Sequence, residues 1–164
     1  LAPDKLDPKH NPLHAFYNNI GPIDSKDGSI FDGNLAQLAD FDPANPAVLG
    51  NAAAACCYIH QAERGLGLAE KAIRTRHGYG FAHFAAGLAN IQLDRNHAGI
   101  EQFEIYSKLE PESHLQFIAA AWTGVGHARA GNYEASCAAF HRSLDLVPLY
   151  APATMLLGCS TTRS

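Results

Sequence analysis

A fixed interval recurs along this chain and constrains its fold more than any single residue does. Pro43, His77 and Pro111 are 34 residues apart, and each closes a segment with a helical pattern. A period of this length fits a pair of antiparallel helices that stacks on its neighbours. Small and aromatic residues share the interval in four pairs: Ala53 and Gly87, Gly65 and Gly99, Ala69 and Phe103, Ala72 and Tyr106.

The interval lengthens to 37 residues in the second half of the chain. We place the extra residues in the loop after Pro111, at 112–116. The segment 151–158 predicts the first helix of a fourth unit, and a helix ending at Asp42 and Pro43 predicts the second half of an earlier one. The six core helices are expected at 46–59, 62–76, 80–93, 96–109, 116–130 and 133–146.

Small residues recur where the two helices of each pair are expected to cross. A glycine inside a helix costs about 1 kcal/mol relative to alanine, so glycines repeated at a fixed phase indicate close packing that offsets the cost. The first helices supply Ala53, Gly87 and Gly124, which are predicted to face Gly65, Gly99 and Ser136 on the second helices.

These residues resemble the tetratricopeptide repeat family over about residues 30–158. The third unit is the clearest, with Gly-Asn-Tyr-Glu-Ala-Ser at 131–136 followed by Phe140 and Pro148. The resemblance implies an all-α, right-handed superhelix of antiparallel helix pairs, with about three repeats and partial flanking repeats. The chain departs from the family pattern at five positions: Leu49, His83 and Ala120 where a large aromatic is usual, His77 where proline is usual, and Tyr106 where a small residue is usual.

In this family the first helix of each unit lines a concave groove, and the resemblance implies a peptide-binding surface there. The groove is expected to be apolar, which suits an amphipathic helix or an extended peptide with large anchors, with Phe81 and Phe84 as the main contacts. An alternative is that another domain of the same protein fills it. The predicted groove residues are Tyr58, Phe81, Phe84, Leu88, Ile91, Gln92, Ile118, Val125 and Arg129.

The spacing also resembles the C-terminal repeat region of bacterial winged-helix or adenylate cyclase-type signalling proteins. The shared segments are Ala-Glu-Lys-Ala-Ile at 69–73, Gly-Ile-Glu-Gln-Phe at 99–103 and Gly-Asn-Tyr-Glu-Ala at 131–135. This resemblance implies a self-associating regulatory module as the alternative to a scaffold module within a larger protein. Neither effector domain is present in the 164 residues.

The composition limits the classes of partner that the chain can bind. The net charge of −4 leaves no basic surface for nucleic acid, and no apolar stretch has the length of a membrane span. Charged residues make up 17% of the chain, below the usual quarter, which predicts that further faces are covered by repeats, another domain or a second subunit. Residues 1–33 are expected to form a loop-rich lead, and 34–164 the repeat domain.

Catalytic patterns are missing from the sequence. The four cysteines show no C-x-x-C pair, which favours buried packing and a reducing, cytoplasmic setting. Nine histidines suggest a metal-dependent enzyme as a third hypothesis, but His83 and His127 lie at unlike phases of the repeat, and no H-E-x-x-H motif occurs. We therefore expect no enzyme activity, no bound metal and no cofactor.

Overall fold

The computed structural model of the protein describes residues 42–161. The expected lead at 1–33, the second helix of an earlier unit and the histidines at positions 10 and 14 lie outside these residues. The described chain folds into seven helices and contains no strand. They are α3 (Pro46–Tyr58), α4 (Ala62–Thr75), α5 (Gly80–Gln92), α6 (Asn96–Leu109), α7 (Gln116–Arg129), α8 (Tyr133–Leu146) and α9 (Ala151–Thr161).

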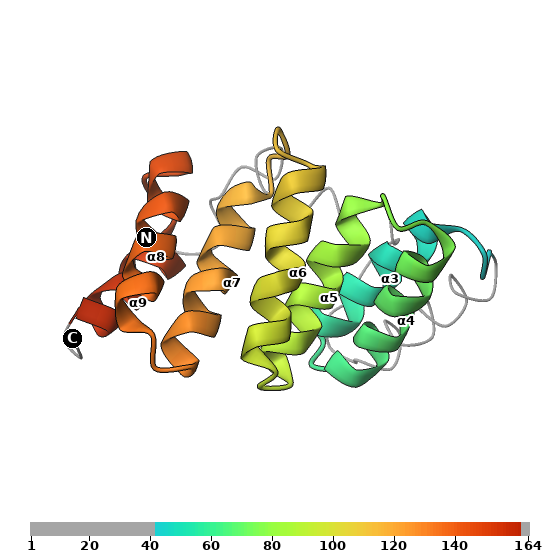
Figure 1. Ribbon diagram of the computed structural model, residues 1–164, viewed down its shortest axis with the longest axis horizontal. Coiled ribbons are helices and arrows are strands. Elements are labelled where there is room, and N and C mark those ends of the chain that lie inside the picture. Colours follow the sequence, from blue (N-terminus) through green and yellow to red (C-terminus); the bar gives the residue numbers. More distant parts are fainter. Residues whose placement is uncertain (1–41, 162–164) are drawn as a thin grey trace, which may run out of the picture.

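The six predicted core helices are confirmed, with ends that differ by at most one residue, and the helix expected at 151–158 extends to residue 161. Helices α3 and α4, α5 and α6, and α7 and α8 form three antiparallel hairpins that follow one another along the long axis of the molecule (Figure 1). Each second helix also packs against the first helix of the next unit, as α4 does on α5 and α8 does on α9. The result is a helical solenoid in which α9 begins a fourth unit.

The predicted helix crossings are confirmed as the closest approaches within the hairpins. A Cβ built at Gly65 would lie 2.8 Å from the Ala53 carbonyl oxygen, and one at Gly99 would lie 3.1 Å from the Gly87 carbonyl oxygen. In the third hairpin, the Ser136 hydroxyl donates a 2.8 Å hydrogen bond to the carbonyl oxygen of Gly124. The small residues therefore let a second helix touch the backbone of the first.

The turns inside the hairpins repeat as closely as the crossings. His60, Asp94 and Gly131 all have a positive φ, and each lies just beyond the end of a first helix. The amide of the following residue returns to a carbonyl in the last turn of the helix, as Gln61 N donates to Cys56 O at 2.8 Å and Arg95 N donates to Asn90 O at 2.8 Å. This pattern closes a helix with a left-handed residue.

Two glycines should therefore respond to alanine with opposite signs. Gly131 has φ of 81°, so Gly131→Ala is expected to lower the free energy of unfolding by about 1–2 kcal/mol. Gly67 lies within α4 with no atom within 4 Å of a built Cβ, so Gly67→Ala should raise it by about 0.5–1 kcal/mol. Urea unfolding of both variants measures this, and a shift of the same sign in both would contradict the assigned turn.

The longer connection between the second and third hairpins is held by side chains. Tyr106, which replaces the small residue of the family pattern, is buried and donates through its hydroxyl to Ser113 Oγ at 2.6 Å. Ser107 Oγ donates to Gln116 Oε1 at 2.9 Å, and Gln116 Nε2 donates to the Glu110 carbonyl at 2.6 Å. The extra residues are thus fixed against α6 and the start of α7.

Candidate binding site

The predicted groove residues divide into buried and accessible sets. Phe84, Leu88, Ile91 and Ile118 belong to the main core cluster, with exposed fractions of 1%, 0%, 0% and 7%. Their side chains are therefore not accessible to a ligand. The other five predicted residues keep some exposure: Tyr58, Phe81, Gln92, Val125 and Arg129.

The close approach of α3 and α5 explains why the first part of the expected groove is closed. A Cβ built at Gly50 would lie 2.9 Å from the ring of Tyr79 and 3.7 Å from Cα of Ala82. Phe81 stacks on Phe84 with ring centroids 5.5 Å apart. Glycine at position 50 brings α3 close to the start of α5, whereas Phe84 packs on Phe103 and Tyr106 of α6 within its own hairpin.

An open hollow lies next to this closed region, beside the C-terminal ends of α3 and α5. Its volume is about 780 Å³. We call it the Trp122 hollow, and it is lined by His60, Gln61, Ala62, Glu63, Arg64, Gln92, Leu93, Trp122 and Arg129. Gln92 and Arg129 were predicted from the sequence as groove residues, whereas Trp122 was not.

Two of the lining side chains also join consecutive units. Gln92 Nε2 donates to the Cys57 carbonyl oxygen at 3.0 Å, and Arg129 Nη1 donates to the Ile91 carbonyl oxygen at 2.6 Å. Both acceptors lie in the last turn of a first helix, and each also accepts a backbone N–H, Cys57 O from His60 and Ile91 O from Asp94 at 3.2 Å. The same bond is thus repeated from one unit to the next, and it fixes the orientation of both side chains at the hollow.

One polar atom of the Gln92 amide has no hydrogen-bond partner among the described residues. Its Oε1 atom is buried, and no hydrogen-bond donor in the described part of the protein reaches it. Gln92 Nε2 donates to the Cys57 carbonyl, and this bond fixes the position of Oε1. A buried acceptor without a donor carries a cost of about 1–3 kcal/mol.

Trp122 gives the hollow its aromatic surface. The indole is half-buried and packs against the main core cluster. Trp122 and Arg129 lie two turns apart on α7 and therefore share a face of the helix. Of the predicted groove residues on α7, Arg129 lines the hollow, whereas Ile118 and Val125 are not among its lining residues.

Charged groups surround this aromatic surface. Glu63, Arg64 and Arg129 are exposed and line the hollow together with His60. The Arg64 guanidinium donates to Gln61 Oε1 at 3.3 Å, across one turn at the start of α4. The hollow thus combines an aromatic side chain with charges of both signs, which suits a ligand of mixed polarity.

The cysteines and histidines make local contacts. Burial raises the pKa of the Cys57 thiol to about 12, so this thiol stays protonated and is a poor nucleophile. The two ring nitrogens of His83 lie 2.8 Å from Gln102 Oε1 and 3.0 Å from the His77 carbonyl oxygen. Burial lowers the pKa of His127, against an opposing effect of Glu104. Within residues 42–161, no three His, Cys, Asp or Glu side chains gather as a metal site.

Comparison with known proteins shows the fold alone. No family model matches the chain, and no curated protein matches its sequence. A crystal structure of MamA protein has a TM-score of 0.70 at 17% identity, covering 83% of this chain and 74% of that chain. The chain folds as a TPR-like helical solenoid. A second structure, MamA 41-end from Desulfovibrio magneticus RS-1, has a TM-score of 0.69 at 17% identity, covering 80% of this chain and 75% of that one.

A further crystal structure of MamA has a TM-score of 0.68 at 16% identity, with 86% of this chain and 85% of that chain covered. These likenesses confirm the predicted all-α superhelix of helix pairs. They do not support the resemblance to winged-helix or adenylate cyclase-type signalling proteins, which stays a prediction. None of the helices in residues 42–161 has both the length and the apolar composition needed to cross a bilayer.

Proposed function

We propose that this chain is a protein-interaction module that binds an extended peptide segment of a partner protein in the Trp122 hollow. The observation that carries the proposal is an open hollow in which the half-buried Trp122 indole lies with Gln92 and Arg129, two side chains held by backbone carbonyls of the preceding unit. An extended peptide suits such a hollow, because one apolar side chain can contact the indole while polar groups of the peptide meet the charged residues around it.

The dimensions and lining of the hollow support a peptide more than a flat protein surface. A volume of about 780 Å³ falls within the range of sites that enclose most of a small ligand. The half-buried indole of Trp122 and the side chain of Leu93 supply an apolar surface for one anchor side chain. Aromatic anchors of this kind provide much of the energy at protein interfaces.

The charged rim selects the residues that flank the anchor. Arg64 and Arg129 are the cations of the lining, and Glu63 is its carboxylate. The segment that fits best therefore carries an apolar side chain for the tryptophan, with an acidic residue within reach of the two arginines. Exposed charge pairs add modest affinity but fix register and orientation.

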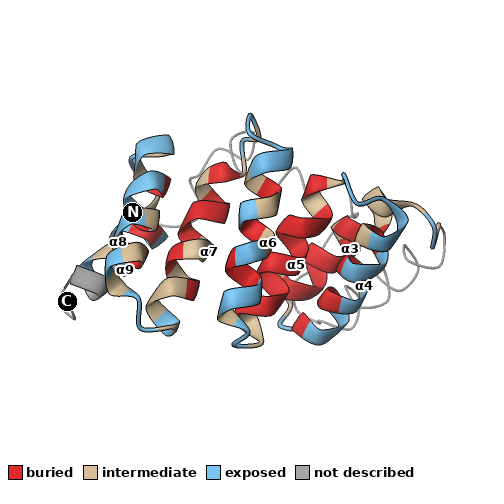
Figure 2. Cartoon of the chain, in the orientation of Figure 1, coloured by how far each residue is buried: buried red, intermediate tan, exposed pale blue. Residues whose placement is uncertain are grey.

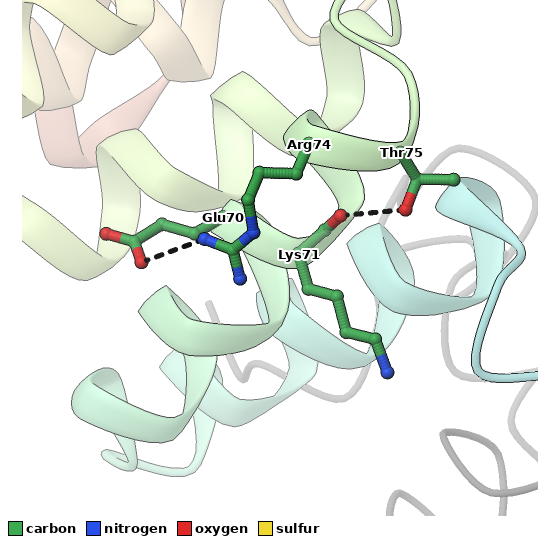
Figure 3. A network of polar contacts seen from close by, with 4 residues as sticks. All are labelled: Glu70, Lys71, Arg74 and Thr75. Atoms are coloured by element: carbon green, nitrogen blue, oxygen red, sulfur yellow. Dashed lines mark hydrogen bonds and ion pairs between the residues drawn. The ribbon is translucent and has the colours of Figure 1, made fainter.

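The proposal is tested by selecting binders from a displayed library of random peptides and measuring their affinity by calorimetry. Trp122→Ala is expected to weaken a selected peptide by at least about tenfold, because it removes the main aromatic contact. The matched control is Arg74→Ala on the outer face of α4, where Arg74 lies 3.8 Å from Glu70 and Thr75 donates to the Lys71 carbonyl (Figure 3). This change should leave the affinity unaltered.

A third variant separates the two possible grooves. Phe81→Ala changes the half-buried aromatic side chain that the sequence favoured as an anchor. If Phe81→Ala weakens binding and Trp122→Ala does not, the ligand lies between α3 and α5 and the assignment to the Trp122 hollow is wrong.

A further inference from the structure

A second hollow lies where α6 and α8, the second helices of their hairpins, flank α7. Its volume is about 480 Å³. We call it the α6–α8 groove, and it is lined by Phe103, Glu104, Ser107, Lys108, Ala120, Thr123, Ala138, Ala139 and Arg142. Helix α7 contributes the floor, and α6 and α8 contribute the two walls. The groove has no lining residue in common with the Trp122 hollow.

A comparison of the second and third hairpins explains why this groove is open. A shift of 37 residues aligns Ala120 with His83 and Ala139 with Gln102. In the second hairpin these two positions are joined, because His83 Nδ1 lies 2.8 Å from Gln102 Oε1. In the third hairpin both positions are alanine, and Ala120 also stands where the family pattern has a large aromatic residue. The groove is therefore a packing position that the chain does not fill with its own side chains.

The burial of the first helices shows the same difference between the two units. Helix α5 is buried over nearly its whole length, whereas α7 has half-buried residues between its buried ones (Figure 2). Ala120 is 8% exposed on the floor, and the Phe103 ring, which is 1% exposed, lies beneath the α6 wall. An aromatic side chain that entered the groove would thus contact an aromatic ring and the methyl groups of alanines.

The charged residues of the walls decide which segment fits. Lys108 on α6 and Arg142 on α8 place an exposed cation on each wall. On α4, the aligned residues Glu70 and Arg74 form a 3.8 Å ion pair (Figure 3). A shift of 34 residues places Glu104 and Lys108 at these positions on α6, but within residues 42–161 neither cation of the groove forms an ion pair. The lining has two cations and one carboxylate, and its charge complements an acidic segment.

We propose that the α6–α8 groove binds a segment of a partner protein that places an aromatic side chain between the two alanines and acidic side chains beside Lys108 and Arg142. The aromatic group takes the place of the large residue that the family pattern has at position 120. The acidic groups fix the orientation of the segment across the two walls. Binding here does not depend on binding in the Trp122 hollow, so one chain can hold two partner segments at the same time.

Nuclear magnetic resonance of the isotope-labelled 164-residue chain tests this site. The probe is the peptide acetyl-Ala-Phe-Glu-Glu-Ala-amide, and its counterpart has lysines in place of the two glutamates. The glutamate peptide is expected to shift the amide resonances of Ala120 and Ala139 in a saturable way. The lysine peptide should bind at least about threefold more weakly, because exposed charge pairs contribute a modest part of the affinity.

Two variants locate the aromatic and the acidic groups separately. The double change Ala120→His with Ala139→Gln installs the pair that the second hairpin contains, and it should weaken the glutamate peptide at least about tenfold because it fills the anchor position. Arg142→Glu should weaken this peptide at least about threefold. The matched control is Lys71→Glu on α4, since Lys71 is exposed at the position aligned with Arg142, and it should bind like the wild type.

Circular dichroism checks that each variant keeps its helices, and Arg142→Glu decides the result if the double variant fails to fold. The proposal is overturned if the two alanine amides show no saturable shift, if the two peptides bind equally, or if the filled variant binds like the wild type. Equal weakening by Lys71→Glu and Arg142→Glu would mean that the peptide responds to charge alone, and would also reject the groove as its site.

Discussion

Phe84→Ala lowers the free energy of unfolding by about 3–5 kcal/mol, which is the largest stability effect we expect from a single truncation in this chain. The ring is 1% exposed and contacts three other aromatic rings: it stacks on Phe81 and meets Phe103 and Tyr106 edge to face, with centroids 5.7 and 5.2 Å away. Alanine would leave a cavity at the centre of the main core cluster, where α5 and α6 pack together.

Urea unfolding followed by circular dichroism measures this loss. Phe81→Ala is the matched control, because the same side chain is removed from a half-buried position on the same helix. Phe81→Ala should lower the free energy of unfolding by clearly less than Phe84→Ala does. Equal losses of stability in the two variants would mean that Phe84 is not at the centre of the core. Phe84 would then again be a candidate for contact with a ligand.

Gly124→Leu is expected to destabilise the third hairpin by about 1–3 kcal/mol or more. Even a Cβ at this position would lie 2.6 Å from the ring of Phe140. The remaining atoms of leucine would clash with this ring unless α8 moved away from α7. That movement would also break the hydrogen bond from Ser136 to the Gly124 carbonyl.

The matched control for this change is Gly67→Leu on α4, where a built Cβ meets no atom within 4 Å. This variant should unfold at or above the wild-type temperature, since leucine favours a helix more than glycine does. If Gly124→Leu also melts at the wild-type temperature, the register of the third hairpin is wrong.

Helix positions and crossings could be predicted because they depend on repeated local signals. The interval of 34 and then 37 residues fixes every hairpin relative to the next, and small residues such as Gly65 and Gly99 can recur at one phase only where backbones touch. These features average over three units, so a single departure such as His77 in place of proline does not obscure them.

The candidate site was less predictable because it depends on how neighbouring units pack. The family positions treat the inner side of each first helix as open, but Phe84 packs on the aromatic rings of α6, and Ile91 lies against Gly99 of α6 and Gly126 of α7. The links from Gln92 to Cys57 and from Arg129 to Ile91 have no sequence signature, since their acceptors are backbone carbonyls.

The fluorescence of Trp122 tests most directly whether the ligand binds in the proposed hollow. Trp122 is the single tryptophan of the chain, so its emission reports on this site alone. Titration with a selected peptide that lacks tryptophan should shift the emission maximum to shorter wavelength and saturate at the affinity measured by calorimetry, because an apolar anchor displaces water from the half-buried indole. Saturable binding by calorimetry with an unchanged Trp122 spectrum would contradict the account and place the peptide elsewhere on the solenoid.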